Sequence, residues 1–296
     1  MLTEANDEAL RRLRALGAFR LRAIVAIDYT YQPYYGSPKA PMVVAGRHQR
    51  GTHWFYAYAC LHIVEAGRRV TIFAKPIHAF SRKEEVLEDL VRAAWSRGVS
   101  IALALLDRAF FTVDVINALR RLKVSFLMPA VKNDAVKASI EAFHGRRLGP
   151  VSRFAMGDGE RKAAFNLIIH PKPLSIDEAI SKRMPIHERY MAFATNLSKP
   201  EALRLYRRLP EDYRKRWGIE TGFRVQGMLE ARTTSRCYTV RLLYRMASIV
   251  LYNVWQLANL LLARKLHRAL DKTFLKAKTL AAWFQSLTKK RPKKPG

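Results

Sequence analysis

Residues 21–29 read LRAIVAIDY, an apolar run that ends close to an acid, and residues 101–107, IALALLD, repeat the pattern. Runs without polar alternation are typical of strands that are covered on both faces of a sheet. An ionised carboxylate at the end of such a strand is costly unless it is paired or binds a metal ion. Ligand sites of open α/β sheets lie outside the carboxyl ends of the strands. The two runs therefore predict an α/β fold with Asp28 and Asp107 at one functional edge.

The segments around these runs predict the rest of a layered sheet domain. Residues 52–63 alternate and are rich in aromatic side chains, and residues 70–77 would pair with them as a hairpin. A capping box of Ser81 and Glu84 predicts a helix over 82–97. We further expect a loop over 31–51, a helix over 111–123 and a strand over 124–129. This order predicts a mixed sheet flanked by helices.

Composition changes divide the chain into five expected segments. Short strands separated by Gly157-Asp158-Gly159 and by proline-rich loops indicate a β-rich insertion before the last helices. The segments are a short N-terminal helix (1–20), the first part of the sheet domain (21–132), the β-rich insertion (133–196), C-terminal helices that complete the domain (197–264), and a helical extension with the basic tail KKRPKKPG (265–296).

The charge of the chain restricts its partners. Its 296 residues include 53 Lys plus Arg against 24 Asp plus Glu, a formal net charge of +29. Such an excess repels itself in a compact fold unless a polyanion binds it, which favours DNA, RNA or an anionic membrane surface. Only two cysteines, Cys60 and Cys237, are present, so a disulfide framework is excluded and a reducing compartment is favoured. No zinc-ligand spacing or phosphate-binding glycine loop occurs in the sequence.

One apolar stretch requires a decision between core and membrane. Residues 246–263, MASIVLYNVWQLANLLLA, contain no charge and approach the length of a membrane span. Asn253, Gln256 and Asn259 recur at intervals of three, so they lie roughly on one side of a helix. This polar stripe favours a buried core helix over a membrane-associated protein, which stays open as the alternative.

A third acid, Glu220, belongs to a basic helical segment. Tyr213, Arg216 and Glu220 fall at i, i+3 and i+7, and Arg224 follows at i+11, which places all four on one helical face. The alternative interpretation is a solvated ion-pair face, in which each pair contributes only about 0.2–0.5 kcal/mol. For Asp28 or Asp107 alone, the alternative is a strand-end acid that bonds nearby backbone or an arginine.

Three blocks of the sequence resemble the acidic motifs of a known enzyme family. The blocks AIDYTYQPYYG (26–36), ALLDRAFF (104–111) and YRKRWGIETGF (213–223) resemble those of DDE transposases of the insertion-sequence-four family. The third motif of that family is Tyr, two residues, Arg, three residues, Glu, six residues, Lys. Tyr213, Arg216 and Glu220 match it, whereas Gly227 stands at the Lys position. Residues 195–197 (TNL) and 232–236 (RTTSR) are also similar to the family, so the resemblance covers about 24–236.

The resemblance implies a fold, a reaction and a set of site residues. It implies a ribonuclease-H-like core, in which the first strand lies beside the fourth and brings Asp28 next to Asp107. It also implies cleavage of transposon ends and joining of the 3′ ends to target DNA, with two Mg²⁺ (or Mn²⁺) ions, often through a hairpin. The implied residues are Asp28, Asp107 and Glu220 as catalytic metal ligands, and Tyr213, Arg216 and Arg224 as DNA contacts.

The expected partners and location follow from the same resemblance. We expect DNA as the partner (transposon ends and target), a homodimer in the synaptic complex, no membrane, and a cytoplasmic location associated with the nucleoid. The alternative is a truncated or domesticated, non-catalytic DNA-binding protein. It is favoured by Gly227 and by the 27 residues before Asp28, fewer than the family usually carries there. A Tyr-rich segment beside Asp28 would either stack on bases or pack on its own surface.

Overall fold

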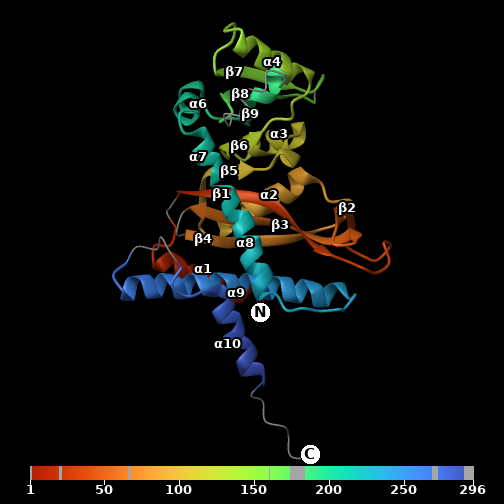
Figure 1. Ribbon diagram of the computed structural model, residues 1–296, viewed down its shortest axis with the longest axis vertical. Helices are drawn as coiled ribbons and strands as arrows, with labels where there is room; N and C mark the ends of the chain where they lie inside the picture. Colours follow the sequence, from red (N-terminus) through yellow and green to blue (C-terminus); the bar gives the residue numbers. More distant parts are fainter. Residues whose placement is uncertain are drawn as a thin grey trace, which may run out of the picture.

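A mixed sheet of nine strands organises the described part of the chain, which comprises residues 2–19, 22–65, 68–159, 161–173, 184–268 and 273–289 of the computed structural model (Figure 1). The strands are β1 (Arg22–Pro33), β2 (Val43–Gln49), β3 (Thr52–Glu65), β4 (Arg68–Ile77), β5 (Ser100–Leu106), β6 (Phe126–Pro129), β7 (Val151–Met156), β8 (Ala163–Pro171) and β9 (Tyr190–Thr195). Their order is β2-β3-β1-β5-β6-β9-β8-β7, and β4 also pairs with β3. The predicted α/β fold with a mixed sheet flanked by helices is confirmed.

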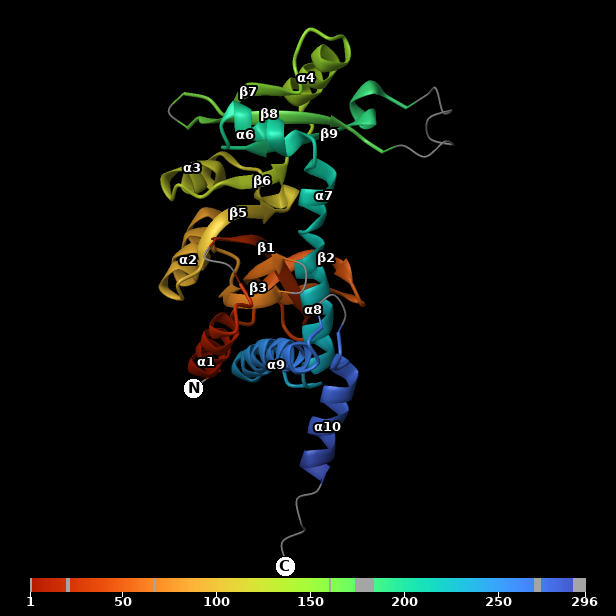
Figure 2. The same ribbon diagram turned by 90° about the vertical axis from the view of Figure 1, so that its left-hand side faces the viewer.

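Helices cover both faces of this sheet, as the turned view shows (Figure 2). The α-helices are α1 (Leu2–Ala15), α2 (Lys83–Ser96), α3 (Val113–Arg121), α4 (Asp134–His144), α6 (Lys199–Tyr206), α7 (Leu209–Arg214), α8 (Trp217–Leu229), α9 (Tyr238–Lys265) and α10 (Ala277–Lys289), and the short 3-10 helices are η1 (Arg108–Phe110) and η2 (Ile186–Arg189). Apolar residues of α1, α2, α3 and α4 pack on one face, and those of α6, α7 and α8 pack on the other.

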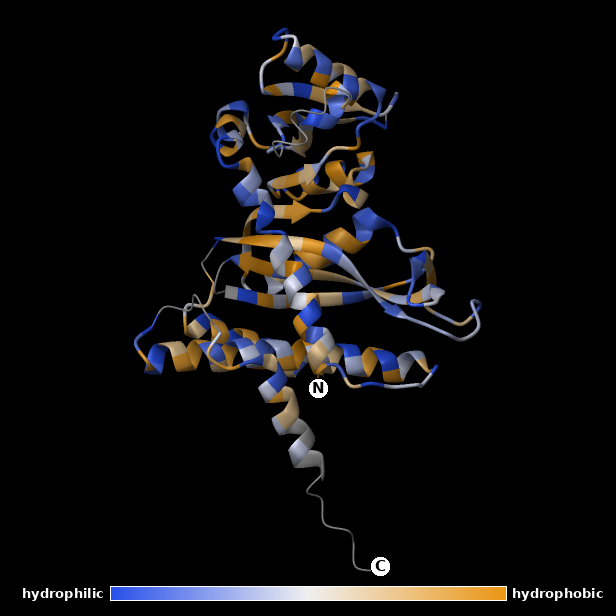
Figure 3. Ribbon diagram, viewed as in Figure 1, coloured by the Kyte–Doolittle hydropathy of each residue, from blue (hydrophilic) through white to orange (hydrophobic). Residues whose placement is uncertain are grey.

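The alternation of side chains along β1 decides which face each residue meets. Val25 and Ile27 join the core beneath α2 and α3, whereas Ala26 joins the core beneath α8. The central strands carry the strongest apolar colouring, since they are covered on both sides (Figure 3). Because successive side chains of a strand point to opposite faces, Asp28 lies on the α8 face and Tyr29 on the other. Tyr29 stacks on Phe110 with ring centroids 5.0 Å apart.

Strands of the segment 133–196 extend the same sheet. β9 pairs antiparallel with β6, with Leu127 opposite Thr195, and β8 and β7 follow outward. The short strands expected in this segment are therefore present. Residues 174–183 of this segment, and 290–296 of the predicted basic tail, lie outside the described residues. The five expected segment boundaries stay predictions.

Two expectations about local structure are wrong. Residues 31–51 were expected to form a loop, but β1 continues to Pro33 and Val43–Gln49 forms the strand β2 at one edge of the sheet. An edge strand needs only a short apolar stretch, because its outer half faces solvent. The predicted cap Ser81 does not cap α2, whose N-cap is Arg82 without a side-chain bond. The Ser81 hydroxyl instead accepts a hydrogen bond from the His78 amide in the preceding turn.

The long helix α9 lies across the end of the sheet domain and packs against α1, β4 and α8 (Figure 1). By length and composition it is the one helix among the described residues that could cross a membrane. Its Asn253 donates to Thr71 O and Asn6 Oδ1, both at 2.7 Å, and accepts from the Thr71 amide. Asn259 accepts from two backbone amides near the start of α10. The polar stripe is thus satisfied by protein groups, which supports the core-helix interpretation.

We expect acidification to destabilise the protein through His62 on β3. Burial, together with the nearby charge of Arg245, lowers the pKa of His62 to about 3. The unfolded chain, with a His pKa of about 6.5, binds the extra proton first, so stability is present above pH 6.5 and is lost as the pH falls toward 3. Between pH 6.5 and 5 this loss is on the order of 2 kcal/mol.

Urea unfolding at pH 7.5 and at pH 5.0 measures the effect of His62. His62→Gln removes the titrating ring, so its free energy of unfolding should change less between the two pH values. An equal change in the wild type and in the variant would contradict the assignment to His62.

Candidate active site

Asp28 and Asp107 lie side by side where the parallel pairing of β1 and β5 ends. Asp107 follows the last residue of β5, whereas β1 continues past Asp28 to Pro33, so the expectation that Asp28 ends its strand is wrong. β1 and β5 pair in parallel, with Ile27 opposite Leu106, so that the two acids follow this last pair. The side chains of both acids project toward the α8 face, by the same alternation that buries Ala26 there. The adjacency expected from the strand order is therefore present in the structure.

Each aspartate uses one carboxylate oxygen locally. Asp28 Oδ1 accepts from the Tyr29 amide at 2.8 Å, and Asp107 Oδ1 accepts from the Arg108 amide at 2.7 Å. Each bond fixes a carboxylate against the backbone amide of the next residue. The alternative interpretation was that each acid bonds nearby backbone. One carboxylate oxygen of each aspartate does so.

Glu220 reaches this edge from α8, which continues the line of α7 along one side of the sheet (Figure 2). Arg216 lies between the two helices, and its Nη2 donates to Glu220 Oε1 at 2.7 Å. Its Nη1 donates to Asp28 Oδ2 at 2.9 Å. One guanidinium therefore links a carboxylate of β1 to a carboxylate of α8, and the Arg216–Glu220 pair expected from the spacing is present.

The charges at this site oppose one another strongly. Burial raises the pKa of Asp28 to about 6; the Tyr29 amide and Arg216 lower it, and the charges of Asp107 and Glu220 raise it. Burial opposes the charge of Arg216, but Tyr213, Asp28 and Glu220 together raise its pKa. The pKa of Asp28 and the pKa of Arg216 are both raised. Both shifts indicate that Arg216 stays charged and that its single positive charge does not balance the three acids.

Tyr213 anchors α7 beside the end of β5. Its hydroxyl donates to the backbone carbonyl of Leu106 at 3.2 Å, directly before Asp107. Its ring contacts Phe193 of β9, and the Arg216 guanidinium lies 5.8 Å from its centroid. Tyr213 thus contacts the end of β5, the strand β9 and Arg216. Its contact with DNA stays a prediction.

The chemistry of the three acids suits a hard divalent cation. Carboxylate oxygens are the ligands that Mg²⁺ prefers, and the charges of Asp107 and Glu220 both act on Asp28. Among the residues that the structure describes, no three acidic, histidine or cysteine side chains stand ready to hold a metal ion together. Arg216 supplies the positive charge between Asp28 and Glu220. The donor set fits a metal, whereas the described conformation holds a guanidinium.

A pocket of about 740 Å³ lies beside this site, between β1, the end of α8 and the start of α9. Its arginines are Arg50, Arg224, Arg232, Arg241 and Arg245. Gly227, at the position of the family's Lys, also lines it, and a Cβ added there would meet open space. The exposed Arg224 therefore stands at the pocket, together with cations from three other parts of the chain.

The sequence did not predict four polar residues of this pocket, Gln32, Glu230, Arg241 and Arg245. Glu230 Oε1 accepts from Gln32 Nε2 at 2.5 Å, and Arg245 lies 3.6 Å from Glu230 Oε2. Arg241 donates to the Pro33 carbonyl. The signal available was the i, i+4 spacing of Arg241 and Arg245 on an otherwise apolar helix.

The Tyr-rich segment divides between the two interpretations left open for it. Tyr34 is buried and packs against Tyr56, with ring centroids 4.9 Å apart. Tyr31 and Tyr35 are exposed, and Tyr31 lines the arginine-rich pocket. Tyr31 and Tyr35 are therefore accessible to a base.

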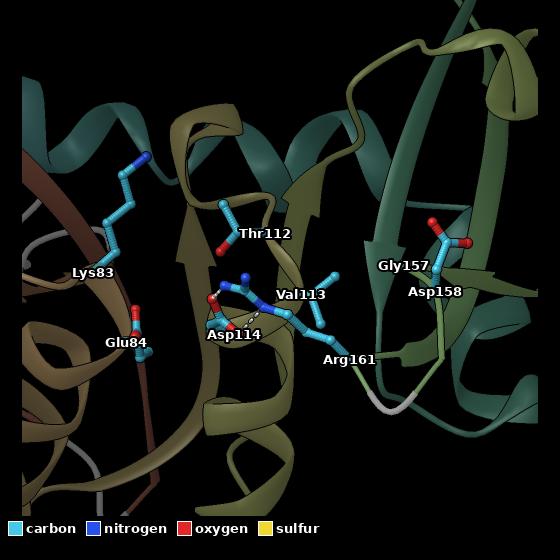
Figure 4. Close-up of a pocket in the computed structure, with 8 residues that line it drawn as sticks. All are labelled: Lys83, Glu84, Thr112, Val113, Asp114, Gly157, Asp158 and Arg161. Atoms are coloured by element: carbon cyan, nitrogen blue, oxygen red, sulfur yellow. Dashed lines mark hydrogen bonds and ion pairs between the residues drawn. The ribbon is translucent and has the colours of Figure 1, made fainter.

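A second pocket, of about 580 Å³, lies away from the three acids, between α2, α3 and the turn that joins β7 to β8 (Figure 4). Arg161 reaches from that turn and pairs with Asp114 at the start of α3. Glu84 pairs with Arg82. These acids are neutralised by arginines, so the pocket reads as an ion-paired junction between the outer strands and α3.

Comparison with known proteins found similarity to transposases. A family model described as "Transposase DDE domain" matches residues 20–254. Among solved structures, the piggyBac transposase synaptic complex with hairpin DNA superimposes with a TM-score of 0.55 at 14% identity, over 90% of this chain and 52% of that one. The Mos1 mariner paired-end complex with Mn gives a TM-score of 0.24 at 14% identity, over 49% and 48% of the two chains. A search of curated proteins found no match.

The extent of these similarities defines what they show. The chain spans about half the length of the piggyBac transposase chain that it matches. At this low identity the likeness concerns the fold, which is ribonuclease-H-like, as expected. The family match covers the segment from β1 to the middle of α9 and thus includes all three acids.

Proposed function

Because the chain belongs to the transposase DDE domain family, we propose that it cleaves transposon ends and joins the 3′ ends to target DNA, with Asp28, Asp107 and Glu220 as catalytic carboxylates. The observation that carries the proposal is the meeting of these acids: parallel neighbours β1 and β5 supply two, and α8 brings the third. The match of Tyr213, Arg216 and Glu220 to the third motif supports assignment to the insertion-sequence-four group.

In this proposal Asp28, Asp107 and Glu220 hold two Mg²⁺ or Mn²⁺ ions. When bound, the ions activate a water or a DNA 3′-hydroxyl and stabilise the oxygen that leaves the phosphorus. The protein's own part is to keep the carboxylates ionised and in place. With a pKa of about 6, Asp28 is ionised above neutral pH, and the backbone amides of Tyr29 and Arg108 hold one oxygen of each aspartate.

DNA is the polyanion that the charge of +29 is proposed to bind. The arginine-rich pocket stands where the family's Lys would project, so we propose that Arg224 and Arg232 hold the phosphate backbone in place of that Lys. The protein would act as a homodimer in a synaptic complex, in the cytoplasm at the nucleoid. The piggyBac structure contains hairpin DNA, which supports proposing a hairpin route here as well.

We expect Arg232→Ala and Arg224→Ala each to weaken DNA binding uniformly across sequences. Each lost phosphate contact should reduce the slope of log affinity against log salt by about one. Fluorescence anisotropy with a labelled duplex at several salt concentrations measures the slope. Arg92→Ala is the matched control, because this exposed cation of α2 lies on the opposite face of the sheet. A slope that falls equally in the control would contradict the assignment.

Cleavage of an end-containing duplex tests the proposed reaction. The substrate carries the inverted repeats that flank the gene, and nicking should appear with Mg²⁺ or Mn²⁺ and disappear with chelator. The alternative function, a non-catalytic DNA-binding protein, is favoured by Gly227 and by the guanidinium among the acids. Tight binding of the ends without nicking in either ion would establish that alternative.

A further inference from the structure

Arg216 is a resident cation of the carboxylate site, where it links Asp28 and Glu220. Its side chain is only 11% exposed, and its two terminal nitrogens bond Asp28 and Glu220. Both are residues that the proposed function assigns to the metal. A guanidinium and a divalent ion at the same carboxylates would repel each other.

The arrangement is also incompletely satisfied. Arg216 Nε is buried without a hydrogen-bond partner among the described residues. A buried donor without a partner is unfavourable. The guanidinium would therefore be more stable beside a ligand that accepts hydrogen bonds from more of the arginine nitrogens. A DNA phosphate is such a ligand, since arginine binds phosphate in a bidentate manner.

We propose that Arg216 is an internal counter-cation that holds Asp28 and Glu220 together in the metal-free protein, and that it leaves them for a DNA phosphate, so that DNA and divalent metal bind cooperatively. The inference rests on the proposed function. It deepens that function by making metal loading conditional on DNA. Coupling of this kind is reciprocal, and it typically changes affinity by about 5- to 150-fold.

Electron paramagnetic resonance of free Mn²⁺ measures metal affinity without any reaction. In the absence of DNA we expect the wild type to bind Mn²⁺ weakly and Arg216→Gln to bind it about 5- to 150-fold more tightly. Arg216→Lys keeps the charge and should stay close to the wild type. Arg214→Gln is the matched control: it removes an exposed cation two residues away that has no bond to the acids.

A second arm adds a random-sequence duplex, which supplies phosphates without transposon ends, and subtracts Mn²⁺ bound by the duplex alone. The wild type should gain Mn²⁺ affinity with the duplex, and Arg216→Gln should gain little. Circular dichroism melting confirms that each variant is folded. Equal Mn²⁺ affinity of wild type and Arg216→Gln without DNA, or an equal gain with DNA, overturns the proposal.

Asp107→Asn separates this inference from the function on which it rests. If Asp107→Asn abolishes Mn²⁺ binding while Arg216→Gln changes nothing, the counter-cation is wrong and the metal site stands. If Mn²⁺ binding survives in Asp107→Asn and also in Asp28→Asn, the proposed metal site itself fails. Tight binding in Arg216→Gln that is lost in the Arg216→Gln, Asp107→Asn double variant supports both.

Discussion

Asp107→Asn is expected to abolish divalent-dependent cleavage while the protein stays folded and binds DNA. Asparagine keeps the shape and the bond to the Arg108 amide but removes the charge that a metal ion needs. Metal ions supply several kcal/mol to phosphoryl transfer, so the rate should fall roughly 10³-fold or more. Asp28→Asn and Glu220→Gln should behave alike, because the three acids act on one site. Nicking of an end-containing duplex in Mg²⁺ measures the loss.

Asp114→Asn provides the matched control for the acids. Asp114 is also an aspartate near the start of a helix, but it pairs with Arg161 at the junction seen in Figure 4, away from the three acids. Its cleavage rate should stay near that of the wild type, and anisotropy should show similar DNA affinity for all four variants. Normal strand transfer by Asp107→Asn would refute the assignment.

Gly222→Ala is expected to destabilise the protein by about 1–3 kcal/mol, because α8 packs too closely on β3 to admit a methyl group. An added Cβ would lie 3.0 Å from two ring atoms of His62, so this fully buried ring would have to move by a few tenths of an ångström. Gly218→Ala would meet Val64 at 3.1 Å. These glycines lie two residues before and after Glu220, so a displaced α8 would also move the third acid and slow cleavage.

Gly227→Ala is the control for this steric prediction. It lies on the same helix, but a Cβ there meets nothing within 4 Å. Alanine is the better helix former by about 0.8–1.0 kcal/mol, so this variant should be as stable as the wild type or more stable. Urea unfolding of the three variants measures the difference. Equal stability of Gly222→Ala and Gly227→Ala would contradict the close-packing argument.

The central fold was predictable from local patterns, because strands that are buried on both faces are apolar at nearly every position. The apolar runs of β1 and β5 predicted strands that are covered on both faces. In the structure these two strands pair in parallel, which places Asp28 beside Asp107. β2 was missed because an edge strand presents one exposed side and carries only three consecutive apolar residues, Val43 to Ala45.

The sequence predicted which residues belong to the site, but only some of the contacts between them. The i, i+4 spacing gave the Arg216–Glu220 pair, but no spacing reveals that Arg216 also binds Asp28, 188 residues away in the chain. Tyr213 and Arg216 were expected to share one continuous helix with Glu220, whereas α7 ends at Arg214 and α8 begins at Trp217. Such long-range contacts depend on tertiary packing, which a linear pattern does not encode.

The sheet is unbroken between its outermost strands and the site. From β7 inward, each strand is hydrogen-bonded to the next through β8, β9 and β6 to β5, the strand that carries Asp107 at its end. No linker interrupts this series of backbone hydrogen bonds. Asp107 therefore follows a strand that belongs to the same hydrogen-bonded sheet as the outermost strands of the described residues.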